Sequence, residues 1–280
     1  MAEATSPTVE DGNEFAPWIG KTETLSDVAS ALQAEGLAAT LDQPAPEGPF
    51  GELLHWLHFL PRVRASEIDV DGHPRRGGFL PPVPLERRMW AAGRLRFLGR
   101  YEAGATLEKR SEILKVAEKT GKTGRMVFVT VGHRLTADGR AICEEEQDIV
   151  YLPMPERFSP PPAQPLPDAL DWSRPQPVDT VTLFRFSALT FNAHRIHFDL
   201  PYATGVEKYP GLIVHGPLQA IWLLEEAKRR NPGRVPATFS FRGVHPLFAH
   251  DAASLNGGGD QLFVAAGSTI TMRAEIGWEG

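Results

Sequence analysis

The residues best suited to chemistry lie in two short segments of the second half of the chain. The first is TFNAHRIHFD (190–199), with two histidines three positions apart and an asparagine five positions before the second. The second is VHGPLQ (214–219), with another histidine followed by glycine and proline. Histidine exchanges protons near neutral pH and also binds metals. A metal site, an acid–base site and hydrogen-bonded structural histidines are therefore the three competing interpretations.

A metal site needs three or four ligands in a closed geometry. His194 and His197 are close in sequence, and His215, His245 and His250 are available elsewhere. However, the sequence has no cysteine pair, no His-Glu-x-x-His motif and no dense carboxylate cluster to support them. We therefore expect neither a bound metal nor a cofactor.

An acid–base site would explain why Asn192 and His197 lie between two apolar segments. Burying Asn192 and His197 between two apolar segments would otherwise cost hydrogen bonding, although a purely structural role stays open. His197 suits proton transfer, and Asn192 suits orienting a water molecule or the imidazole ring. Gly216 stands at the start of an expected helix, where free backbone N–H groups favour negative charge. A base beside such an oxyanion donor indicates hydration or dehydration next to a carbonyl.

The helix expected after Gly216 covers residues 217–230. Pro217 suits the first helical position, and its first two turns are apolar on nearly every side, so the helix should be buried. Asn231-Pro232-Gly233 should end it. We expect strands at 237–244, 261–266 and 268–276, and a segment that begins as a strand at 178–190.

The first half of the chain has long strand signals. Residues 22–41 have apolar positions at helical spacing, which predicts a helix. Residues 77–84 (GGFLPPVP) are a loop by composition. Strands are expected at 94–101 and 105–119, and a hairpin joins 126–131 to 141–152 through Ala137-Asp138-Gly139. A buried helix next to antiparallel strands predicts an α+β fold in which a sheet curls around the helix.

Proline divides the chain. Residues 153–177 hold nine of its 25 prolines, which excludes a helix or a central strand there and predicts an extended connector. We therefore expect a disordered lead-in (1–15), a first half (16–152), the connector (153–177) and a second half (178–280) that carries both motif segments.

Composition narrows the classes of function. The 280-residue chain carries a net charge of −6, which argues against nucleic-acid binding. No apolar run is long enough to span a membrane, and the acidic N-terminus does not have the pattern of a signal peptide. A single cysteine, Cys143, fits a reducing compartment. These features predict a cytoplasmic protein, or a mitochondrial matrix protein if the source is eukaryotic.

Arginine is concentrated in the first half. Residues 62–100 hold nine arginines and no lysine. Because guanidinium groups bind phosphate or carboxylate through two parallel hydrogen bonds, the cluster suits an anionic ligand. A solvated surface of ion pairs is the alternative, and both stay open.

The motif segments resemble those of the MaoC-like (R)-specific enoyl-CoA hydratases, whose usual motif reads S-G-D-x-N-P-x-H-x-D. Alignment on the second histidine places His197 on the catalytic histidine and Asn192 on the catalytic aspartate. IVHGPL (213–218) matches the family's I-V-H-G-M-L, which implies that Gly216 is the oxyanion glycine. An asparagine is not a base, so the resemblance implies that His197 does most of the proton transfer.

The variant motif, together with PLERRMWA (84–91), is similar to one branch of this family. The branch contains mitochondrial 3-hydroxyacyl-thioester dehydratases and bacterial mesaconyl-C4-CoA (3-methylfumaryl-CoA) hydratases. The resemblance implies a double hot-dog fold with one active site between the halves. It also implies an acyl-CoA substrate that contacts some of five side chains: Arg87, Arg88, Arg94, Arg195 and His215.

The substrate divides the functional hypotheses. The arginine-rich first half and the absence of a visible targeting segment favour hydration of mesaconyl-C4-CoA to citramalyl-CoA, or of the related itaconyl-CoA. A dehydratase of fatty 3-hydroxyacyl thioesters, carried by CoA or by acyl carrier protein, is the alternative. A non-catalytic thioester-binding protein is the second alternative, because Asn192 replaces the family's acid. Fusion of the halves forms a pseudo-dimer, which leaves a further homodimer possible.

Overall fold

The computed structural model of the protein describes residues 14–121 and 124–280. The expected lead-in (1–15) lies outside these residues except for Glu14 and Phe15, and Phe15 is buried. The strands are β1 (Thr22–Val28), β2 (Arg87–Phe97), β3 (Thr106–Gly121), β4 (Gly124–Ala137), β5 (Arg140–Leu152), β6 (Trp172–Pro175), β7 (Pro236–Gly243), β8 (Ala253–Gly258), β9 (Gln261–Ala266) and β10 (Thr269–Trp278). The helices are α1 (Ala31–Thr40), α2 (Thr180–Leu189), α3 (Leu200–Gly205) and α4 (Gly216–Arg230), with short 3-10 turns η1 (Ala16–Trp18), η2 (Leu54–Leu57), η3 (Ala65–Glu67) and η4 (Arg195–His197).

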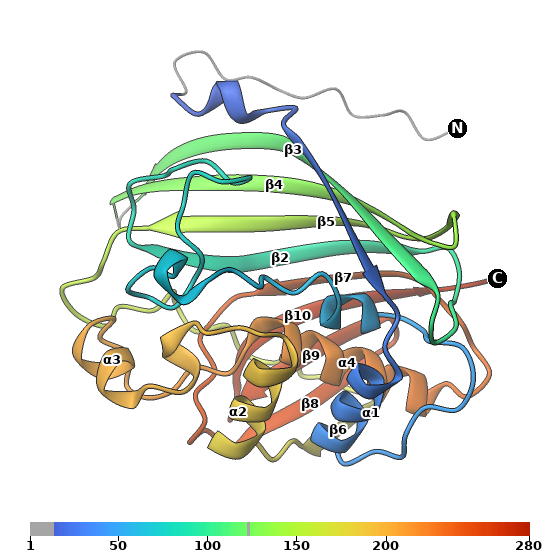
Figure 1. Ribbon diagram of the computed structural model, residues 1–280. Helices are drawn as coiled ribbons and strands as arrows, with labels where there is room; N and C mark the ends of the chain where they lie inside the picture. The colour runs from blue at the N-terminus through green and yellow to red at the C-terminus, as the bar shows by residue number, and fades with distance from the viewer. Residues whose placement is uncertain (1–13, 122–123) are drawn as a thin grey trace.

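The strands form one antiparallel sheet in the order β1-β3-β4-β5-β2-β7-β10-β9-β8-β6. Strands β1–β5 come from the first half, and β7–β10 come from the second, so the halves meet where β2 pairs with β7. At this seam Gly93 lies opposite Phe241, and a Cβ on Gly93 would come within 2.4 Å of the Phe241 ring. The sheet arches over the helices (Figure 1), which confirms the predicted α+β class.

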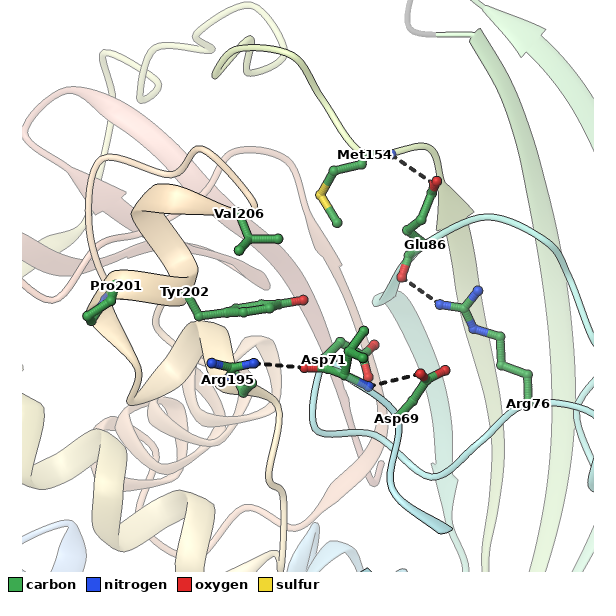
Figure 2. Close-up of a pocket in the computed structure, with 10 residues that line it drawn as sticks. Asp69, Asp71, Arg76, Glu86, Met154, Arg195, Pro201, Tyr202 and Val206 are labelled. Atoms are coloured by element: carbon green, nitrogen blue, oxygen red, sulfur yellow. Dashed lines mark hydrogen bonds between the residues drawn. The ribbon is translucent and has the colours of Figure 1, made fainter. Parts of the chain in front are cut away.

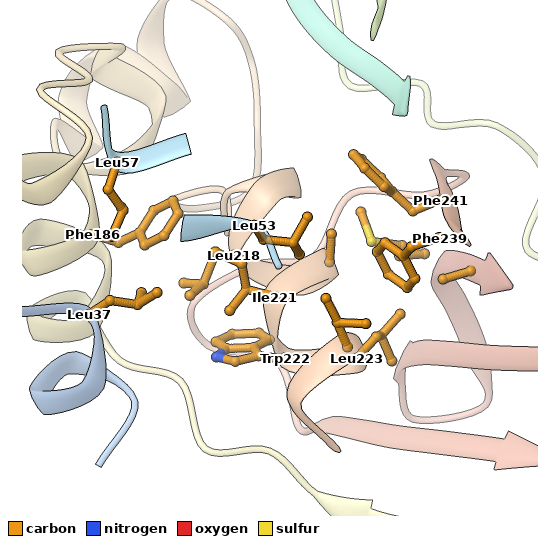
Figure 3. Packing of buried hydrophobic residues seen from close by; sticks show 14 of the residues in the cluster. Leu37, Leu53, Leu57, Phe186, Leu218, Ile221, Trp222, Leu223, Phe239 and Phe241 are labelled. Atoms are coloured by element: carbon orange, nitrogen blue, oxygen red, sulfur yellow. The ribbon is translucent and has the colours of Figure 1, made fainter. Parts of the chain in front are cut away.

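The second-half strands enclose α4, as expected. This helix packs against β7–β10, and its apolar residues are buried on nearly every side. Phe239 and Phe241 approach it from the sheet, and Leu37 of α1 and Phe186 of α2 lie on its opposite side (Figure 3). Helix α4 is therefore the centre of a three-layer core. None of the described helices has the length and apolarity needed to cross a membrane.

Different elements pack on the inner face of the first-half strands. Helix α1 packs on α2 and on η2, and η2 contacts one end of the inner face of the first-half sheet, whose other end packs against Phe15, Val83 and Leu85. At the end that η2 contacts, His55 and Trp56 hydrogen-bond to the Glu145 carboxylate of β5, at 3.0 Å each. Leu57 of η2 and Leu53, which precedes it, belong to the same hydrophobic cluster as the apolar residues of α4. A short turn thus stands where the second half has a full helix.

Two predicted elements were wrong in part. Residues 22–41 are not one helix, because Thr22–Val28 form β1 along the edge of β3 and only Ala31–Thr40 are helical. Strand pairing outweighed the helical spacing of the apolar residues. The segment expected to begin as a strand at 178–190 is helix α2, whose N-terminus is capped when the Asp179 carboxylate accepts from Thr182 N–H at 2.7 Å. Strand β8 was missed because it ends in Asn-Gly-Gly, a sequence typical of turns.

The proline-rich segment does not form a helix or a central strand. Its last residues form β6, which is the edge strand beside β8. Arg174 of β6 donates to the buried Glu226 carboxylate of α4 at 2.8 Å, and Arg229 and Arg230 donate to the same carboxylate. Burial alone would raise the pKa of Glu226, but the three guanidinium groups outweigh it and lower the pKa to about 2. This cluster ties the edge of the sheet to the central helix.

Replacing Glu226 with glutamine should lower the free energy of unfolding by about 1–3 kcal/mol at pH 7, because three guanidinium groups lose a charged acceptor. The Glu226 pKa is depressed below its ordinary value of 4.5, so its stabilisation is present above pH 4.5 and is lost as pH falls toward 2. Urea unfolding of wild type and E226Q between pH 7 and pH 3 should show the difference shrinking. The exposed Glu275 of β10 provides the control, E275Q, which should leave stability unchanged at every pH.

Candidate active site

The loop that carries the first motif follows helix α2. The Thr190 hydroxyl donates to the Phe186 carbonyl at 2.8 Å, and Phe191 then adopts a left-handed conformation with φ of 49°. Asn192 N–H donates back to the Ser187 carbonyl, so the chain reverses at the end of the helix. The Asn192 side-chain oxygen in turn accepts from His194 N–H at 3.0 Å. Asn192 therefore shapes the turn, and its side-chain NH₂ has no hydrogen-bond partner among the described residues.

His197 lies at the end of η4 and is only 7% exposed. Its Nδ1 lies 2.8 Å from the Ile213 carbonyl oxygen. A carbonyl can only accept, so Nδ1 carries the proton and Nε2 presents a lone pair. Burial, together with the neighbouring His215 and His194, holds the pKa of His197 well below its ordinary value. The ring is therefore neutral and ready to accept a proton at Nε2.

The second motif places His215 and Gly216 next to His197. The His197 and His215 rings are stacked with their centroids 3.6 Å apart. His215 Nε2 lies 2.9 Å from Ser187 Oγ, and burial lowers its pKa to about 3. Gly216 begins α4, where the first N–H groups lack acceptors within the helix. The position of a Cβ on Gly216 would lie 3.8 Å from the Trp90 carbonyl of β2, so the helix N-terminus faces the first half.

A loop of the first half locks onto the motif loop. The Asp71 carbonyl accepts from Arg195 N–H at 2.9 Å. Gly72, with φ of 96°, lies so close that a Cβ there would stand 1.7 Å from the Ala193 carbonyl oxygen. His73 packs on His194 with ring centroids 4.1 Å apart. The motif loop is therefore positioned by both halves of the chain.

Asp71, His73 and His194 form a cluster that sequence reasoning missed. One ligand atom from each lies within 4.8 Å of the others, which is a spacing suited to a metal ion. However, Asp71 Oδ2 and His73 Nδ1 are 2.9 Å apart, as a direct hydrogen bond requires. Asp71 and His73 therefore satisfy each other without an ion. The only signal in sequence was an aspartate and a histidine on either side of Gly72.

The five side chains expected to contact substrate are distributed unevenly. Arg87 pairs with buried Glu207 at 3.4 Å and donates to Tyr209 Oη at 2.6 Å. Arg88 makes no ion pair among the described residues. Arg195 binds Asp199 at 2.7 Å, next to the motif loop. Together with His215, these three surround the histidines.

Arg94 lies elsewhere. It pairs with Asp148 and Glu146 on the solvent-exposed face of the sheet, and Arg96 pairs with Glu144 beside it. The structure does not bring Arg94 to the histidines. The arginine-rich segment is therefore divided between an exposed ion-pair surface and the surroundings of the site, rather than gathered into one anion-binding patch.

Two cavities adjoin the motif loop. The larger is an open groove of about 580 Å³ between α3 and the Asp69–Asp71 loop, in which Arg195 and Tyr202 face Arg76 and Glu86 (Figure 2). The smaller has a volume of about 150 Å³. It lies between η2 and the first-half sheet and touches Thr190 of the motif loop and Trp90.

Comparison with known proteins identifies relatives of the whole arrangement. Residues 51–249 match the model of the hydroxyacyl-thioester dehydratase type 2 family. The chain is 45% identical over 245 residues to mesaconyl-C(4)-CoA hydratase of Chloroflexus aurantiacus, covering 84% of this chain and 85% of that protein. It is 28% identical to the mitochondrial hydroxyacyl-thioester dehydratase type 2 of Schizosaccharomyces pombe, covering 70% and 73%.

Solved structures confirm the predicted fold. A MaoC-like dehydratase superposes with a TM-score of 0.66 at 13% identity, covering 94% of this chain and 98% of that one. A Mycobacterium tuberculosis protein with a double hot-dog fold superposes with a TM-score of 0.53 at 13% identity, covering 93% and 96%. The double hot-dog architecture expected from the sequence is therefore confirmed.

Replacing Gly72 with alanine should displace the motif loop, because the new Cβ meets the Ala193 backbone and the residue has positive φ. We expect the free energy of unfolding to fall by about 2–4 kcal/mol, measured by urea unfolding. Gly78 has open space around its Cα and no positive φ, so G78A serves as the control. Equal stability of G72A and G78A would show that the contact between the two loops is not tight.

Proposed function

The chain belongs to the hydroxyacyl-thioester dehydratase type 2 family, and from this premise we propose that it reversibly adds water to the double bond of an enoyl-CoA thioester. Family membership confirms the predicted class of enzyme, a hydratase or dehydratase. The observation that carries the proposal is a neutral buried imidazole, His197, beside the N-terminus of α4 at Gly216. Mesaconyl-C4-CoA, the substrate in the name of the relative that is 45% identical, is the substrate we favour.

The mechanism begins with the thioester carbonyl. Its oxygen accepts a hydrogen bond from Gly216 N–H, and the partial positive charge at the helix N-terminus stabilises the enolate that forms. His197 Nε2 removes a proton from water while the water oxygen bonds to the β-carbon. Electrons of the double bond move through the α-carbon to the carbonyl oxygen. The imidazolium then returns the proton to the α-carbon, which restores the carbonyl and the neutral base.

The hydrogen bond to Ile213 supports this cycle. The carbonyl holds the Nδ1–H, so the protonated ring keeps one donor satisfied while Nε2 transfers its proton. Asn192 does not take part as a base. Its side-chain oxygen is occupied by His194 N–H, so its NH₂ is the group available to hold the attacking water. One histidine can serve both proton transfers, because hydration has no net exchange of protons with solvent.

Several finer features belong to this proposal. A fatty 3-hydroxyacyl thioester is the alternative substrate, favoured by the similarity to the S. pombe dehydratase. Itaconyl-CoA is the close neighbour of the favoured substrate. A non-catalytic thioester-binding protein is the other alternative, because Asn192 replaces the family's aspartate. The cytoplasmic location and the homodimer stay predictions.

Replacing His197 with alanine should lower kcat/KM for hydration by about 100- to 10,000-fold, because the base is removed. Thioester absorbance should be followed with mesaconyl-C4-CoA, itaconyl-CoA and crotonyl-CoA. Binding of a saturated acyl-CoA, measured by calorimetry, should change little in H197A. Wild-type protein that binds thioesters but turns over none of them would instead indicate a binding protein.

The pH dependence of kcat/KM should reflect the low pKa of His197. Since the base is active when neutral, activity should stay level from pH 8 down to below 6.5 and fall only near the depressed pKa. Replacing Asn192 with aspartate adds a negative charge that favours the protonated ring, so the acidic limb should move to higher pH. Identical profiles for wild type and N192D would exclude His197 as the titrating base.

A further inference from the structure

The smaller cavity contains charged groups that the mechanism does not use. One side is formed by Trp90, whose backbone carbonyl lies 3.8 Å from the position of a Cβ on Gly216, and by Thr190 of the motif loop. Its other side reaches the inner face of the first-half sheet at Lys109 of β3 and Glu145 of β5. Its volume of about 150 Å³ is small beside the roughly 300–1,000 Å³ typical of sites for drug-sized ligands. The cavity is therefore suited to a short group with a polar end.

Glu145 is already satisfied within the fold. Its Oε1 accepts from Trp56 at 3.0 Å and from Gln147 at 2.9 Å, and its Oε2 lies 3.0 Å from His55 Nε2. Burial alone would raise the pKa of Glu145, but the hydrogen bond and charge of His55, with His133, outweigh it and lower the pKa to about 2. The carboxylate is ionised and surrounded by donors, so it does not need Lys109.

Lys109 is a cation in this cavity that has no anionic partner within ion-pair distance among the described residues. Among the described residues it makes no hydrogen bond or ion pair, and its Nζ lies 5.0 Å from the centre of the Phe59 ring. Burial lowers the pKa of Lys109, while Glu145 and Glu23 oppose the change from beyond ion-pair distance. Lys109 is half-buried, so its ammonium group is only partly removed from water, and no carboxylate lies within ion-pair distance to offset that loss. An anion that enters the cavity would offset that loss.

The cavity's other polar side chains do not compete for this role. His58 Nδ1 donates to the Leu54 carbonyl and its Nε2 accepts from Ser30 N–H, so both nitrogens are occupied. The unpaired Arg88 does not line this cavity, and its charge acts on His73 and Tyr151. Lys109 is therefore the only cationic side chain, histidines aside, among the cavity's lining residues.

We propose that this cavity receives the acyl group and that Lys109 binds a carboxylate at its distal end, which makes the enzyme selective for short dicarboxylic enoyl thioesters. The inference rests on the proposed hydratase function and specifies its substrate class. A long apolar chain would have to bury its methylene groups against Lys109 and Glu145, which leaves the ammonium unpaired. A carboxylate instead forms a charge-assisted hydrogen bond there.

The test compares K109M with wild type on mesaconyl-C4-CoA and on crotonyl-CoA, which lacks the carboxylate. K109M should lose about 10- to 100-fold in kcat/KM on mesaconyl-C4-CoA and change by less than about threefold on crotonyl-CoA, because one charged hydrogen bond is removed. K109R should retain part of the activity. The exposed Lys115 of the same strand provides the matched control, K115M, which should match wild type on both substrates.

A second measurement uses only the wild-type protein, so it does not depend on the folding of a variant. Succinyl-CoA and butyryl-CoA are saturated thioesters that differ by a terminal carboxylate. Succinyl-CoA should inhibit crotonyl-CoA hydration with a Ki at least about tenfold lower than that of butyryl-CoA. Equal Ki values would overturn the proposal.

The remaining outcomes separate the two proposals. Equal losses of K109M on both substrates would assign Lys109 a structural role, and a selective loss in R88M instead would place the carboxylate beside His73. A wild-type preference for crotonyl-CoA would reject the dicarboxylic substrate while leaving the hydratase intact. Wild type without activity on any enoyl thioester would reject the hydratase function itself.

Discussion

The pairing of β2 with β7 is the contact on which the site depends. It joins the two halves into one sheet and brings the Trp90 carbonyl to the N-terminus of α4 at Gly216. The Asp71–His73 loop, which precedes β2, docks onto the motif loop at Ala193. The second half carries His197 and Gly216, and the first half contacts the motif loop and lines most of the smaller cavity. The site is therefore a property of the interface between the halves.

Burial controls the protonation of this interface. His73, His197 and His215 are all held neutral, because a buried imidazolium would lose its hydration and face other histidines. The buried carboxylate of Glu145 behaves differently. Hydrogen-bond donors surround it, so its pKa is lowered and it stays ionised. Neutral imidazoles and ionised carboxylates therefore lie side by side at this interface, as His73 and Asp71 do at 2.9 Å.

The two halves differ in their cores. In the second half a full helix, α4, fills the inner face of the sheet, and its N-terminus faces the first half. In the first half the short turn η2 takes that place and leaves a cavity beside it. A short turn covers less of the sheet than a helix of four turns. The smaller cavity that remains is where we propose that the acyl group binds.

The sequence by itself determined the local features. The apolar turns after Pro217 predicted the buried helix, because that signal lies within a few residues. The motif segments indicated a hydratase or dehydratase, which the family match confirms, and the roles of Asn192, His197 and Gly216 stay predictions. Only the tertiary structure decided what depends on contacts between distant segments. The edge pairing of β1, the Asp71–His73 loop against His194, and the unpaired charge of Lys109 are of this kind. Their physical cause is contact between segments that are distant in sequence, which no local pattern records.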